Sequence, residues 1–133
     1  MNPYHNILTL KGDGAIVQEC FENIKNADSL IDFNNIIPKP FWVKKEDWQE
    51  EWWGCRFNAS ETMRADNAIS FDTDSIPVPV IEALSSYFPE LQLELAVSFL
   101  SEEEGNLQFK LMACDGRIFN NDNLLSKRER RKK

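Results

Sequence analysis

The chain has 133 residues, of which 42% are hydrophobic and 28% are charged, a composition typical of one globular domain and not of a disordered segment. No apolar run approaches the roughly 18 residues that a membrane-spanning helix requires, and the first residues lack the pattern of a secretion signal. Three scattered cysteines, with no CxxC pair and one histidine in the chain, argue against a disulfide framework or a zinc site. We therefore expect a cytoplasmic protein.

The charge is divided between an acidic body and a basic end. The net charge is −7, but residues 127–133 hold six bases and one acid, so residues 1–126 carry −12. A body this acidic repels nucleic-acid phosphates and favours basic partners. We expect one domain at 1–126 and a flexible basic tail at 127–133. The alternative use of the tail is nucleic-acid contact by its bases, Lys127, Arg128, Arg130, Arg131, Lys132 and Lys133.

The first third of the chain predicts a strand, a helix and a second extended segment. Apolar and polar residues alternate over 4–11, which is typical of a half-buried strand. Asp13 is a natural N-cap for a helix that continues to about Asn26 with one apolar stripe. Residues 29–37 read as a further extended segment, which the prolines of 38–40 end.

The second half predicts further strands around one helix. In chain order the pattern gives a strand at 68–73, a helix opening at 75–79 and stopped by Pro89, a hairpin of strands at 91–100 and 107–114, and a brief strand at 117–119. This order predicts an α+β fold of the ferredoxin-like type. It has a mostly antiparallel sheet, two helices on one face and an aromatic-rich helical insertion at about 38–66.

The insertion holds the most unusual composition of the chain. All four tryptophans and two phenylalanines fall within residues 41–57, and Trp48 and Trp52 share one face of an expected helix. One interpretation is a satellite core that seals an end of the sheet, because buried indole rings hide much apolar surface. The other is a partner-binding surface, because tryptophan is prominent among interface hot spots. The candidate partner-binding residues are Trp42, Trp48, Glu50, Glu51, Trp52, Trp53 and Arg56.

Two motifs carry a resemblance to a known family. The run 53–59, Trp-Gly-Cys-Arg-Phe-Asn-Ala, resembles a W-G-x-K-W-D/N-A signature. A second block comprises 71–73, Pro77, Pro79-Val80, Leu84-Ser85 and Phe88-Pro89. Both blocks are similar to those of YubB-like proteins of plasmids, phages and other mobile elements. The resemblance implies a ferredoxin-like domain in a mobile-element setting. It implies no catalytic residue and no cofactor, because that family has no established activity.

The sequence offers little for catalysis. With His5 as the one histidine, Ser-His-Asp or Cys-His chemistry would depend on the first strand. Asp72 and Asp74 are weak candidates for a magnesium site, and they are more typical of a cap for the helix that follows. The open face of the sheet is expected to carry polar side chains and no aromatic ring on which a base could stack.

These observations favour binding over catalysis, with no catalytic residue and no cofactor. We expect a mobile-element protein that engages a basic host protein or nucleoprotein complex, such as an inhibitor of host defence. The acidic body would steer the encounter and the tryptophan segment would anchor it. The alternative is a nucleic-acid accessory protein that uses the basic tail.

Overall fold

The computed structural model describes residues 3–120, so the predictions made for the 127–133 tail lie outside the described residues. The fold is α+β, with one six-stranded antiparallel sheet and three α-helices. The strands are β1 (Tyr4–Lys11), β2 (Ser60–Ala65), β3 (Ala68–Thr73), β4 (Gln92–Ser101), β5 (Gly105–Cys114) and β6 (Arg117–Asn120). The helices are α1 (Gly14–Ile24), α2 (Lys45–Trp53) and α3 (Val78–Tyr87), with a 3-10 turn, η1 (Phe33–Asn35).

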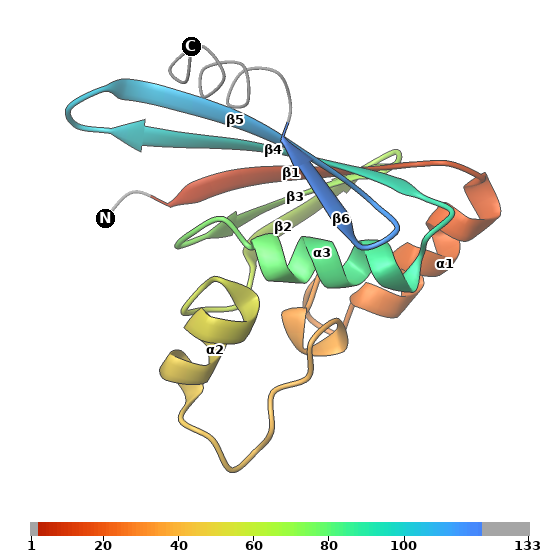
Figure 1. The fold of residues 1–133 in the computed structure, drawn as a ribbon, viewed down its shortest axis with the longest axis horizontal. Coiled ribbons are helices and arrows are strands. Elements are labelled where there is room, and N and C mark those ends of the chain that lie inside the picture. Colours follow the sequence, from red (N-terminus) through yellow and green to blue (C-terminus); the bar gives the residue numbers. More distant parts are fainter. Residues whose placement is uncertain (1–2, 121–133) are drawn as a thin grey trace.

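The molecule has two layers, with the strands in the order β2-β3-β1-β4-β5-β6. In Figure 1, α1 and α3 lie against one face of the sheet, and α2 and the loop before it hang below them, away from the sheet. Alternate residues of β1 and β4 fill the space between the layers, since Leu8, Leu10, Leu93 and Leu95 are fully buried. The core therefore lies on one face of the sheet and the other face is open.

The predicted strand at 4–11 and the helix after it are confirmed. β1 spans the predicted residues, and the Asp13 side chain accepts a hydrogen bond from the amide of Ala15 at 2.8 Å, as an N-cap does. The helix ends at Ile24, two residues before the predicted end. Its apolar stripe is buried against the sheet through Val17, Cys20, Phe21 and Ile24.

The expected extended segment at 29–37 is wrong. This segment contains η1 and pairs with no strand among residues 3–120. Asp32 caps the turn by accepting from the amide of Asn34 at 2.9 Å, and Asn58 binds both the Asp32 carboxylate, at 2.7 Å, and the amide of Phe33. A side chain 26 residues away thus fixes the turn, which no local alternation of residues could reveal.

Asp32 makes the stability of this turn depend on pH. Burial raises the pKa of its carboxyl, but hydrogen bonds from Asn26, Asn58 and Asn34 outweigh that effect and hold the pKa below its usual value. A lowered pKa stabilises the fold above the unfolded value of about 3.9, and that stabilisation is lost as the pH falls through the lower folded value.

We expect Asp32→Asn to lower the free energy of unfolding at neutral pH and to lose that deficit in acid. The measurement is urea unfolding of both proteins at neutral pH and at about pH 2, because the stabilisation by the charged carboxyl decreases as the pH falls. A deficit of the same size at both pH values would show that the charge of Asp32 contributes nothing.

The edge strand β2 was not predicted. It falls inside the expected insertion, and almost all of its side chains are exposed, so its sequence lacks the apolar alternation that marks a half-buried strand. It pairs with the predicted strand β3 across the turn Asp66-Asn67. The register shifts between Ser60 and Met63, and Glu61 has a positive φ of 52°, which is the geometry of a β-bulge.

The helix and hairpin of the second half are confirmed. β4 and β5 pair without interruption from Gln92–Cys114 to Ser101–Gly105, and the brief strand β6 follows. Asp115 and Gly116 both have positive φ, as a type I′ turn requires. Tyr87, the last residue of α3, is 58% exposed.

Candidate partner-binding site

The helix α2 is fixed to the body by its last turn. Trp53 is 1% exposed, and its Nε1 donates a hydrogen bond to the backbone carbonyl of Ile37 at 2.8 Å. Its ring meets that of Phe33 edge-on, with the centroids 5.6 Å apart. The buried Gln49 donates from Nε2 to the carbonyl of Arg56, which ties α2 to the chain that leaves it. Trp53 is thus buried, as one interpretation of the sequence predicted, but in the main core and not in a satellite core, because Phe33 also contacts Phe71 of β3.

The remaining tryptophans lead from that core to the surface. The half-buried Trp48 meets Trp53 edge-on at 5.8 Å and stacks on Trp52 with the centroids 6.1 Å apart. Trp52 is 49% exposed. The spacing of four residues does put Trp48 and Trp52 on one helix face, as predicted. The three rings form a continuous path from the buried Trp53 to solvent.

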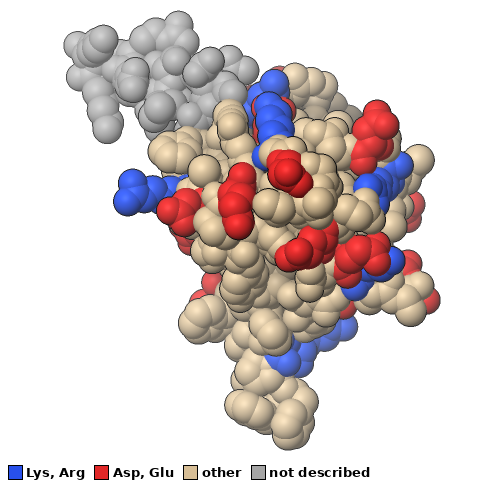
Figure 2. All heavy atoms as spheres, turned by 90° about the vertical axis from the view of Figure 1, so that its right-hand side faces the viewer, with Lys and Arg blue, Asp and Glu red and all other residues tan. Residues whose placement is uncertain are grey.

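The most exposed aromatic side chains lie in residues 38–44, here called the aromatic loop. Phe41 is 89% exposed and Trp42 is 74% exposed, and their rings contact each other edge-on at 5.1 Å. In Figure 1 this loop is the part of the chain below α2, on the side away from the sheet. In the view of Figure 2, the molecule ends at the bottom in a projection of uncharged atoms. An exposed tryptophan beside an exposed phenylalanine makes a compact apolar contact surface.

A groove of about 430 Å³ lies between α2 and α3, here called the α2–α3 groove, and Ile37, the residue before the aromatic loop, lines it. Trp52, Glu51 and Glu82 are among the residues that line it, and no base is among the described residues that do. Its apolar lining comes from Ile37, Pro79 and Ala83. A lysine or arginine side chain fits this chemistry, because its stem can lie on apolar atoms while its charge meets carboxylates and an indole face.

The structure separates the predicted partner-binding residues into two groups. The prediction that Trp53 is a surface residue that binds the partner is wrong, because Trp53 lies in the core. Its side of α2 packs on Phe33 and Ile37. The exposed members are Trp42, Glu50, Glu51, Trp52 and Arg56, with Trp48 half-buried behind them. Sequence reasoning missed Phe41 and Glu82. The aromatic run signalled Phe41, whereas nothing local signalled Glu82, which reaches the groove because α3 packs beside α2.

Asp72 and Asp74 have other partners. Asp74 accepts hydrogen bonds from the amides of Arg56 and Phe57 at 3.0 to 3.3 Å, so it fixes the chain after α2. The prediction that it caps α3 is wrong, because α3 has no side-chain cap. Asp72 binds His5, with Oδ1 2.7 Å from Nδ1. Within residues 3–120, no group of three or more metal-ligating side chains is close enough to hold an ion.

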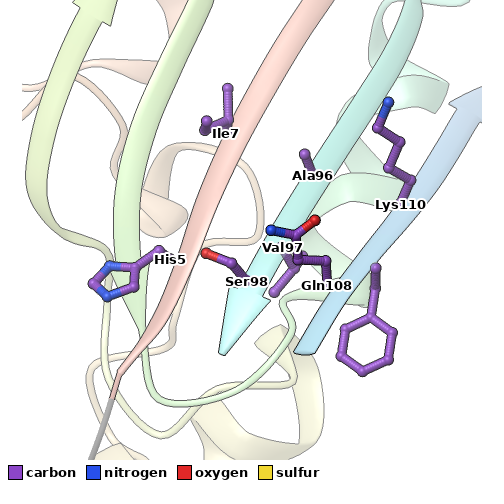
Figure 3. Close-up of a pocket in the computed structure, with 8 residues that line it drawn as sticks. His5, Ile7, Ala96, Val97, Ser98, Gln108 and Lys110 are labelled. Carbon is purple, nitrogen blue, oxygen red and sulfur yellow. The ribbon is translucent and has the colours of Figure 1, made fainter. Parts of the chain in front are cut away.

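The open face of the sheet carries a shallow groove of about 240 Å³ over β1, β4 and β5. The register puts Asp72, His5 and Ser98 in one row across three strands. In Figure 3 the His5 ring points away from Ser98, so the row does not form a base and a nucleophile in contact.

Burial raises the pKa of the Cys20 and Cys55 thiols to about 12, which leaves both protonated at neutral pH.

The prediction that the open face lacks an aromatic ring is wrong. Phe119 of β6 is 53% exposed and pairs with Met112, whose row continues through Glu94 to Thr9. β6 has only four residues, too few for apolar alternation to predict which of them face the open side. A single ring at the end of this row is far from the set of two or three that stacks on successive RNA bases.

Comparisons with family models, with curated proteins and with solved structures gave no match to this chain. None of the helices formed by the described residues combines the length and the apolar character that crossing a membrane demands.

Proposed function

We propose that this chain is a non-enzymatic binding protein that engages a basic host protein or nucleoprotein complex. The observation that carries the proposal is the exposure of Phe41 and Trp42, 89% and 74%, on a loop beside the acidic helix α2. Few residues supply most of the energy of an interface, and tryptophan is prominent among them. The α2–α3 groove supports the basic character of the partner, because two glutamates and a tryptophan line it.

We further propose a ferredoxin-like topology and a mobile-element setting. Support for the topology comes from the strand order β2-β3-β1-β4, with α1 following β1 and α3 following β3. Support for the setting comes from the resemblance of residues 53–59 and 71–89 to YubB-like proteins of plasmids and phages. In such a setting the basic partner is a host factor in the cytoplasm, with inhibition of a host defence complex as the biological effect.

The test begins with affinity capture from the native host, followed by measurement of affinity for the captured partner. We expect the double variant Phe41→Ala, Trp42→Ala to weaken binding by about thirtyfold or more, since loss of one hot spot costs about 2 kcal/mol. The matched control is Phe57→Ala, Tyr87→Ala, which removes two aromatics that are also more than half exposed. Equal binding by the two double variants would overturn the assignment of the aromatic loop.

The same assay separates the basic-partner proposal from its alternative. Glu51→Gln, Glu82→Gln should weaken binding several-fold at low salt and less at high salt, because screening removes the charge attraction.

Deletion of 127–133 should leave partner binding unchanged. If that deletion abolishes capture and nucleic acid is the captured species, the alternative of a nucleic-acid accessory protein is correct.

A further inference from the structure

The two edges of the sheet differ in how they meet solvent. At the β2 edge, the bulge at Glu61 breaks the register with β3, and Arg64 adds a charge. Bulges and charges are the devices with which natural sheets prevent edge-to-edge pairing. The β2 edge is therefore protected against the addition of another strand.

The opposite edge is protected over only part of its length. β6 pairs with residues 111–114 of β5, and among residues 3–120 no strand lies on the outer side of 105–110. Alternate residues of an antiparallel strand direct N–H and C=O groups toward each side. Residues 105–110 contain no proline, and their register with β4 is uninterrupted. We call residues 105–110 the β5 edge, and this edge can pair with another strand.

The β5 edge also borders apolar side chains that the helices cover incompletely. On the helix side of β5, Ala113 is fully buried and Leu111 is 6% exposed, whereas Phe109 and Leu107 are only half-buried. Tyr4 and Phe99, in the same row as Leu107, stack with their rings 4.4 Å apart. Figure 1 shows the β4–β5 hairpin extending past the helices. A strand added at this edge would extend the apolar surface.

We propose that a second copy of this chain occupies the β5 edge, with the two β5 strands antiparallel and Leu107 opposite Leu107 on the twofold axis. This register pairs residue 105 with residue 109, so it uses the stretch that has no outer strand among residues 3–120 and stops before residue 111, which pairs with Asn120 of β6. A twofold interface must be complementary to itself. Here Leu107 and Phe109 of both copies meet across the axis, and Phe99 and Tyr4 continue the row of each Leu107 away from it.

Charge complementarity favours a second copy over a basic peptide. The same register puts Lys110 of each copy beside Glu104 of the other, at the two ends of the paired segment. Glu104 ends the acidic turn Glu102-Glu103-Glu104, so each lysine faces a turn of opposite charge. A basic peptide strand on the β5 edge would instead meet Lys110 as a like charge. This inference is independent of the partner bound at the aromatic loop.

The test is the mass of the full chain at micromolar concentrations, measured by sedimentation velocity. We expect the wild type to have twice the mass of one chain. Lys110→Glu and Glu104→Lys should each raise the dissociation constant of the dimer about tenfold, and the two changes together should restore it, because the pair is then reversed. Leu107→Asp should give monomers, while Met63→Asp on the protected β2 edge, where Met63 is 70% exposed, should leave the dimer intact.

Each remaining outcome overturns the proposal. A monomeric wild type does so, as does a charge reversal that fails to restore the dimer. If only the chain without residues 121–133 forms a dimer, the chain's own end occupies the edge instead. Phe41→Ala, Trp42→Ala should remain dimeric, so failure of partner capture and failure of dimer formation are told apart.

Discussion

Replacing Trp53 by alanine is expected to lower the free energy of unfolding by about 3–5 kcal/mol, the usual cost of removing a large buried aromatic side chain. Trp53 is 1% exposed and is among the largest fully buried side chains. Its loss leaves a cavity beside Phe33 and Trp48 and removes the donor that satisfies the carbonyl of Ile37. Urea unfolding followed by circular dichroism measures the effect.

The neighbouring residue provides the control. Trp52 is 49% exposed, and its main contact is the stack on Trp48. Trp52→Ala should therefore cost less than about 1 kcal/mol, as substitutions of exposed residues usually do. Equal losses for Trp53→Ala and Trp52→Ala would contradict the division of this helix into a buried and an exposed side.

That division shows where the sequence stops being informative about the site. The concentration of tryptophans in 41–57 marks the segment, and helical spacing puts Trp48 and Trp52 together. Spacing does not predict which side of a short helix packs on the rest of the protein. Trp53 packs on Phe33 and Ile37, and these residues belong to a turn that the sequence did not predict. Glu82 joins the groove through the packing of α3 beside α2, which is a tertiary contact.

The fold shows the same limit. Strands β1, β4 and β5 were predictable because their apolar residues alternate against a core on one face. β2 was not, because an exposed edge strand needs no such alternation. The turn at 33–35 was not predictable, because Ile31 and Phe33 are both buried and their spacing of two residues is that of a half-buried strand. Its conformation depends on hydrogen bonds from Asn58, which is distant in sequence.

The second large loss in the free energy of unfolding is expected for a substitution at Gly54, where α2 ends next to α3. Gly54 has a φ of +80°, and a Cβ built there would lie 2.8 Å from Cδ of Pro79 and 3.1 Å from the carbonyl oxygen of Ile76. Gly54→Ala therefore combines a left-handed backbone, which costs about 1–2 kcal/mol for a residue with a Cβ, with a steric clash. Crowding of this kind adds about 1–3 kcal/mol.

A matched control isolates the clash. Gly105 has nearly the same φ, +78°, but a Cβ there would meet no atom within 4 Å. Gly105→Ala should therefore lose only the backbone contribution, about 1–2 kcal/mol, and unfold at higher urea than Gly54→Ala. Because Pro79 lines the α2–α3 groove, relief of the clash must move α2 away from α3, so Gly54→Ala should also weaken partner binding. Equal losses at the two glycines would show that α2 does not press on α3.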